Sequence, residues 1–154
     1  MTEKNKNAVV AALTLSLSAC ASLSQEPSWS APENNDSRVL IYRVSGSHSS
    51  AVNAYFGTQE HYVVGIRPNQ YSVVTVPSGE HSFRVGSGSS SSAVTINATL
   101  TPDETLCLKV KSNPAQWIGA IIPLLAIGIP TFNSEIVECP DQEELSEFAL
   151  VESV

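Results

Sequence analysis

From Arg38 onward, apolar and polar residues alternate with a period of two, and short apolar runs are separated by residues typical of turns. This period places alternate side chains on opposite faces of a strand, whereas a helix needs a period near 3.6. The alternation is clearest in His81–Val85, Val94–Leu100 and Leu106–Val110. In the third run Lys109 marks the outer face, and we expect each of these strands to be half buried.

Five further runs are expected to form strands: Arg38–Val44, Ala51–Phe56, Tyr62–Ile66, Tyr71–Val76 and Ser134–Glu138. Charged residues make up only 15% of the chain, while Ser, Val and Thr are plentiful, which favours strands over helices. Roughly eight short strands at this spacing predict an all-β domain over residues 38–154, folded as an antiparallel β-sandwich or open barrel.

Two segments depart from the strand pattern. The low-complexity run Gly86–Ser92 predicts a flexible hairpin tip. After Pro140, Asp141 is placed to cap a helix whose first turn is acidic, and negative charge stabilises a helix N-terminus. We therefore predict a short C-terminal helix within residues 141–148.

The N-terminus has the pattern of an export signal. Lys4 and Lys6 precede an apolar stretch, Ala8–Leu17, which small residues follow. A stretch of about ten residues is too short to span a membrane but suits a secretory signal peptide. We predict that residues 1–19 are such a signal peptide.

The signal peptide ends in Leu17-Ser18-Ala19-Cys20, which resembles the lipobox of bacterial lipoprotein precursors. The resemblance implies that signal peptidase recognises Leu17, Ser18 and Ala19, and that the thiol of Cys20 accepts lipid. A diacylglyceride and an N-acyl chain on Cys20 exceed the two signals needed for stable anchoring to a membrane. The absence of Asp just after Cys20 resembles precursors that are sorted to the outer membrane, so we expect a lipid-anchored protein of the bacterial cell envelope.

The residues after the anchor predict a tether. Residues 20–37 are rich in Ser, Pro, Asn and acidic residues without an apolar period, as in disordered segments. A flexible chain of this length spans on the order of 20–25 Å, which would keep the domain close to its membrane. The net charge of −7 makes nucleic acid a poor partner.

Four segments carry a resemblance to a family: RVLIYRV (38–44), AVNAYFGTQEHYVVGI (51–66), NQYSVVTVPSGEHSFRV (69–85) and TPDETLCLKV (101–110). Their order is similar to that of the uncharacterised lipoprotein family called domain of unknown function 2846. The resemblance extends over about residues 38–147, although the first loop is richer in serine here. It implies a β-sandwich-like domain on a lipid anchor, with no assigned activity and no catalytic residues to transfer.

The sequence indicates neither a metal site nor an enzyme. His48, His61 and His81 lack a second ligand at the spacing that zinc sites use, so no metal and no cofactor are expected. His81 is instead expected to hydrogen-bond within the turn formed by Pro77–Glu80. The chain has no G-x-S-x-G nucleophile motif and no phosphate-binding loop.

Two cysteines, Cys107 and Cys139, remain once Cys20 carries lipid. We expect a disulfide between them, because an exported compartment permits one, and two unpaired thiols are the alternative. Closing a loop of this length would contribute roughly 3–4 kcal/mol of stability in the chain-entropy model.

Trp117–Phe132 contains no charged residue, yet it is shorter than a spanning helix and is interrupted by Gly and Pro. One interpretation is a connection packed over an open face of a sheet. The other is an exposed loop that docks into a membrane or a partner, because a large exposed apolar patch usually marks an interface. The candidate contact residues are Trp117, Ile118, Ile121, Ile122, Leu124, Leu125, Ile127, Ile129 and Phe132.

These features favour a non-catalytic interaction or accessory module that lipid holds near the membrane, with an envelope protein as its partner. A carrier of lipid or a small apolar ligand is the alternative, and a hydrolase with a dispersed site is a weaker one. An enclosed apolar cavity would favour the carrier, and a flat exposed loop the interaction module.

The lipobox generates the first prediction. A Cys20→Ala variant should carry no metabolically labelled fatty acid and should leave the membrane fraction, because its lipid acceptor is gone. Labelling followed by cell fractionation measures both properties. A variant that is still labelled and fractionates normally would contradict the assignment.

Overall fold

The computed structural model describes residues 36–46, 50–88, 92–116 and 128–153. The predicted signal peptide and nearly all of the predicted tether lie outside these residues. The elements are β1 (Ser37–Arg43), β2 (Ala54–Thr58), β3 (Tyr62–Ile66), β4 (Gln70–Val76), β5 (Gly79–Gly86), β6 (Val94–Leu100), β7 (Thr105–Ser112), β8 (Phe132–Val137), α2 (Gln142–Leu145) and β9 (Ala149–Leu150). The eight expected strands are present, and the two-residue β9 is additional.

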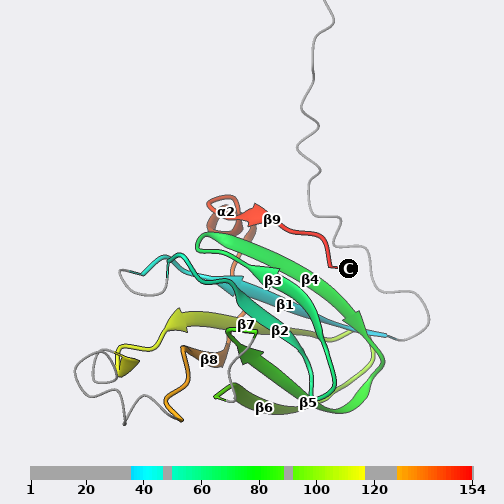
Figure 1. Cartoon of the computed structure of the whole chain (residues 1–154). Helices are drawn as coiled ribbons and strands as arrows, with labels where there is room; N and C mark the ends of the chain where they lie inside the picture. Colours follow the sequence, from blue (N-terminus) through cyan, green and yellow to red (C-terminus); the bar gives the residue numbers. More distant parts are fainter. Residues whose placement is uncertain (1–35, 47–49, 89–91, 117–127, 154) are drawn as a thin grey trace, which may run out of the picture. The chain divides into compact units, whose positions relative to one another are not determined.

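The strands form two sheets that pack face to face (Figure 1). Sheet A has the order β8-β7-β1-β4-β9, and sheet B has the order β3-β2-β5-β6. The predicted all-β sandwich with a short C-terminal helix is therefore confirmed, and the sheets do not close into a barrel.

The strand β1 lies at the centre of sheet A and pairs along its whole length. It runs antiparallel to β4 and parallel to β7, and β9 is likewise parallel to β4. Sheet A is thus mixed, whereas the prediction was of antiparallel strands. Alternation shows which face a residue occupies, but it carries no information on which distant strand becomes the neighbour.

Apolar side chains fill the space between the two sheets. The largest fully buried ones include Phe56 and Phe83, whose rings lie 5.3 Å apart, and Phe132 from β8. Each fully buried side chain of this size contributes about 1.5–3 kcal/mol. The interior that the structure describes is thus packed with side chains.

The outer face of sheet A is also covered, by the segment that contains α2. Asp141 caps α2 by accepting a hydrogen bond from the Glu144 backbone, as predicted, and Leu145 is buried. Phe148 packs edge-to-face on Tyr42, with ring centroids 5.5 Å apart. Cys107 of β7 packs in the same cluster on the outer face of sheet A and is only 1% exposed. The expectation that β7 is half buried was therefore wrong.

A disulfide joins Cys107 to Cys139, as the sequence analysis expected. It links β7 directly to the residues just before α2, 32 positions later in the chain. The bond therefore fastens the covering segment to the outer face of sheet A.

The turn before β7 fixes the start of β1. The Ser37 hydroxyl donates to the Thr101 carbonyl (2.6 Å), and the Arg38 amide donates to the Glu104 carbonyl (2.8 Å). Because β1 and β7 are parallel, Asn113, which follows β7, lies at the opposite end of sheet A from Ser37. Ser37 and Asn113, the described residues nearest to the predicted tether and to the uncharged segment, therefore lie at opposite ends of sheet A.

Candidate functional site

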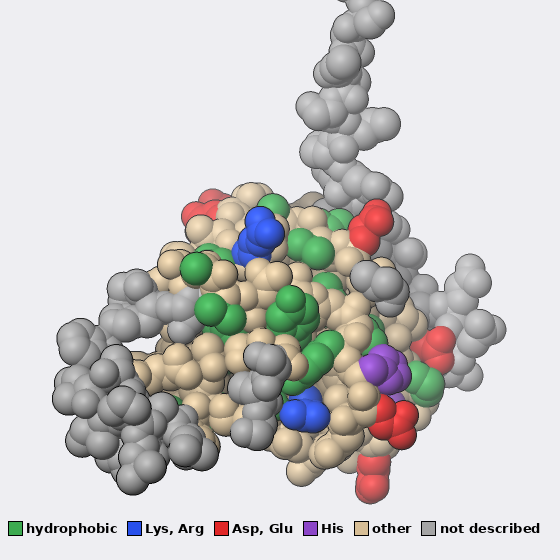
Figure 2. Space-filling model, in the orientation of Figure 1, with side chains coloured by type: hydrophobic (Ala, Val, Ile, Leu, Met, Phe, Trp, Pro, Cys, Tyr) green, Lys and Arg blue, Asp and Glu red, His purple; other side chains and the backbone are tan. Residues whose placement is uncertain are grey.

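The outer face of sheet B carries an unusual group of side chains. Tyr55 of β2 lies opposite Gly65 of β3 and Gly86 of β5, and Gly57 lies opposite Tyr62 and Arg84. Sheet B lies in front of sheet A in Figure 1, and the same view in Figure 2 shows hydrophobic side chains in the middle of this face, between Lys or Arg side chains. Aromatic and basic groups thus gather on one rigid surface.

Glycines make room for the two tyrosine rings. A Cβ atom added at Gly65 or at Gly88 would approach the Tyr55 ring to within 2.8 or 2.9 Å, and one at Gly86 would lie 2.9 Å from the Tyr62 hydroxyl. The rings therefore lie close over backbone that bears no side chains, and their centroids are 5.7 Å apart. Tyr55 and Tyr62 are both half-buried, and the Tyr62 hydroxyl is itself inaccessible to solvent.

Arg84 connects this aromatic pair to the turn between β2 and β3. Its guanidinium lies 5.8 Å from the centroid of the Tyr62 ring, and it donates a hydrogen bond to the Gln59 carbonyl (3.3 Å). The Gln59 amide in turn donates to the Ser82 hydroxyl (3.1 Å). A cation over an exposed ring contributes about 0.5–1 kcal/mol, so these contacts position Arg84 more than they stabilise the fold.

Two hollows border the face. The first has a volume of about 610 Å³ and lies beside Tyr55; its lining is Ser50, Ala51, Val52, Asn53, Tyr55, Arg67 and Ser87. Its polar lining and its Arg67 side chain suit a hydrogen-bonding or anionic group on a ligand. Tyr55 contributes the aromatic edge of this hollow.

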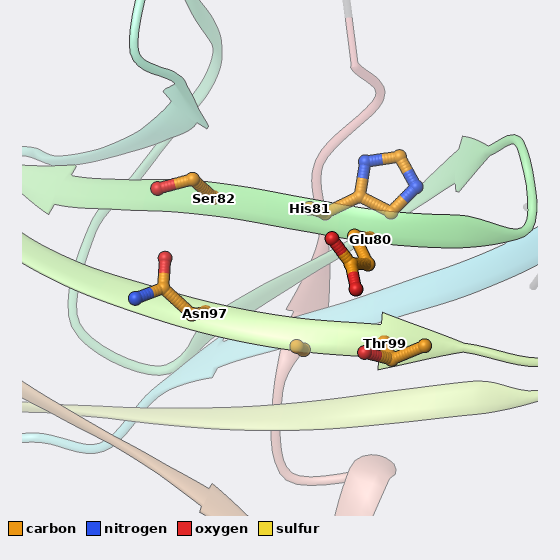
Figure 3. Close-up of a pocket in the computed structure, with 6 residues that line it drawn as sticks. Glu80, His81, Ser82, Asn97 and Thr99 are labelled. Atoms are coloured by element: carbon orange, nitrogen blue, oxygen red, sulfur yellow. The ribbon is translucent and has the colours of Figure 1, made fainter.

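The second hollow, of about 500 Å³, lies along β5 and β6 (Figure 3). Figure 3 shows the Glu80 side chain directed toward β6 and Thr99, while the His81 ring is directed away from β6. His81 Nε2 lies 2.7 Å from the Pro77 carbonyl oxygen, and the ring stacks on Phe83. The predicted role of His81 in holding its turn is thus confirmed.

The chemistry that these groups offer is binding. The face presents aromatic surface, hydroxyl and amide groups and two guanidinium groups, which together suit recognition of a ligand. Within the described ranges, no three His, Cys, Asp or Glu side chains gather closely enough to hold a metal ion.

Most of the predicted site residues lie outside the described residues. These are Leu17, Ser18, Ala19 and Cys20, together with Trp117, Ile118, Ile121, Ile122, Leu124, Leu125 and Ile127. No helix in the part that the structure describes is long and apolar enough to cross a membrane.

The two flanks of the uncharged segment are held together by Asn113. Its amide group donates to the Pro130 carbonyl (2.9 Å), and its backbone amide donates to the Thr131 carbonyl (3.0 Å). The Gln116 side chain adds a hydrogen bond to the Thr131 hydroxyl (3.0 Å). The described residues on the two sides of 117–127 therefore meet at one point of the fold.

At the end of this segment Ile129 is half-buried, and Phe132 is fully buried. The prediction that Phe132 contacts a membrane or partner was wrong, because Phe132 begins β8 and faces the interior. The Arg43 guanidinium lies 4.6 Å from the centroid of its ring. The absence of charge in the sequence did not reveal where the loop ends and the strand begins.

Arg43 is itself a buried cation, with only 1% of its side chain exposed. It donates hydrogen bonds to the carbonyls of Val52 (2.5 Å) and Ile66 (3.3 Å), and burial lowers the pKa of Arg43 from its ordinary value. One side chain of β1 thus joins the loop before β2, the end of β3 and the start of β8. This role was not predicted from the sequence, although an arginine at the end of an apolar run is a signal for it.

The sequence analysis also missed Tyr55, Tyr62 and Arg84. A usable signal was present, because glycines within strands often mark a close approach of other groups to the backbone. In comparisons with protein-family models, curated proteins and solved structures, nothing matches this chain.

The buried arginine generates a prediction. Arg43→Met should lower the free energy of unfolding by about 1–3 kcal/mol, because the Val52 and Ile66 carbonyls lose their charged donor. Urea unfolding of the mature chain measures the change. The control Arg67→Met removes an exposed guanidinium and should cost less than about 0.5 kcal/mol. Equal midpoints for the two variants would contradict the role of Arg43.

Proposed function

We propose that this protein is a lipid-anchored lipoprotein of the bacterial cell envelope, and that its β-sandwich is a non-catalytic interaction module. The lipobox-like residues Leu17–Cys20 support the anchor. The resemblance to the lipoprotein family called domain of unknown function 2846 supports the same class of protein. The outer membrane is the proposed location, with lipid on Cys20 as the attachment.

The observation that carries the binding role is the aromatic and basic surface of sheet B. Tyr55, Tyr62 and Arg84 project from paired strands, so their positions cost little entropy when a partner binds. Tyrosine and arginine are also the residue types that contribute most at protein interfaces. We therefore propose an envelope protein as the partner of this surface.

In this fold, the hollow beside Tyr55 lies far from the residue at which the proposed tether joins the domain. The tether joins at Ser37, while the hollow beside Tyr55 is lined by residues 50–53, from the loop that follows the far end of β1. Side chains fill the described space between the sheets, so no specific observation favours the alternative of an apolar-ligand carrier.

Photocrosslinking in intact cells tests the proposal. A photoreactive amino acid in place of Tyr62 should give one defined covalent adduct with another envelope protein, and Arg84→Glu should remove that adduct by reversing a charge of the surface. The matched control carries the same probe at Thr75, which is exposed on sheet A. No adduct at Tyr62, or the same adduct from Thr75, would contradict the binding role of this surface.

A further inference from the structure

The strand β6 forms an edge of sheet B, and its sequence leaves that edge unprotected. β6 pairs with β5 on one side over seven residues, without a register shift, and within the described part of the chain no strand pairs with its other side. Its residues, VTINATL, include no charge, proline or glycine. Natural sheets usually guard an edge with such residues, with bulges or with very short strands.

The other edges of the two sheets are guarded in these ways. β8 carries Glu135, which forms an ion pair with Lys111 of β7. The pairing of β3 with β2 is interrupted by a register shift between Phe56 and Gly57, and β9 has only two residues. β6 is therefore the edge suited to accept another strand.

The sequence of β6 matches itself when two copies run antiparallel about an axis at Asn97. Thr95 then lies opposite Thr99 of the other copy, and Ile96 lies opposite Ala98. Thr95 and Thr99 are exposed on the outer face, where threonine pairs stabilise neighbouring strands. The Asn97 amide has both donors and acceptors, so two Asn97 side chains can hydrogen-bond to each other across the axis.

Charge opposes a second copy less at this uncharged edge than at the charged surfaces of the chain. The chain has a net charge of −7, so most of its surfaces repel those of an identical molecule. β6 itself brings no charge to such a contact, and Glu80 of the neighbouring β5 is the charged side chain that lines the hollow of about 500 Å³ along the two strands. Val94 of β6 lines another hollow together with residues of β8, whereas Thr95, Asn97 and Thr99 of β6 are exposed.

We propose that β6 is a self-association edge, through which two copies of this chain join into one continuous sheet around a two-fold axis at Asn97. This inference does not rest on the partner proposed for the tyrosine surface, because the backbone edge of β6 carries the contact between the two copies, whereas the partner would bind Tyr55, Tyr62 and Arg84. The two-fold symmetry fixes which residues meet, and it thus makes the register testable.

Engineered disulfides test the edge and its register in cells that express the full chain. Asn97→Cys should form a disulfide-linked dimer on oxidation, because residues directly opposite each other have Cα atoms about 4.5–5.5 Å apart, within reach of a disulfide. Thr95→Cys alone and Thr99→Cys alone should form no disulfide-linked dimer, since each residue lies about 13 Å along the strand from its own counterpart across the axis. The two variants expressed together should crosslink.

The matched control is Ser82→Cys, which pairs with Asn97 from β5 and would lie about 14 Å from its counterpart. Non-reducing gels and mass spectrometry identify the products, and Asn97→Lys should abolish dimers of the purified chain in light scattering. If Asn97→Cys does not fold, the crosslink between the co-expressed Thr95→Cys and Thr99→Cys variants tests the proposal instead. A folded variant pair without crosslink, or a crosslink to a different protein, would overturn the proposal.

Discussion

The rest of the structure depends on β1, whose two neighbours and two faces are all occupied. Val39 and Ile41 pack between the sheets, while Leu40 and Tyr42 pack under the C-terminal segment, and all four are nearly inaccessible to solvent. Arg43 ends the strand and binds carbonyls from the segments around it. Sheet B, α2 and the start of β8 are therefore positioned by contacts with a single strand.

The local pattern of the sequence predicted the strands well and their neighbours poorly. Turn residues and alternation located β3 and β6 to the residue, because these signals act over a few positions. The parallel pairing of β1 with β7 and the covering of Cys107 depend on contacts between distant segments, which no local pattern contains. The continuous apolar run of β1 did indicate that this strand is buried on both faces.

The candidate site was hidden for a related reason. The longest uncharged segment predicted contact residues that included Phe132, but Phe132 belongs to the interior. Tyr55 and Tyr62 come together only when β2, β3 and β5 pair, since the glycines beneath their rings belong to different strands or loops. The pairing register of these strands brings such a surface together, so a search for local sequence motifs does not detect it.

Hydroxyl-radical footprinting tests most directly whether the tyrosine surface is the binding face of an envelope lipoprotein. Oxidation would be compared between the protein in native envelopes and the same lipidated chain in detergent micelles. We expect Tyr55 and Tyr62 to be oxidised less in envelopes, relative to Leu150, which is 45% exposed on a strand of sheet A. Equal ratios in the two preparations would contradict the account.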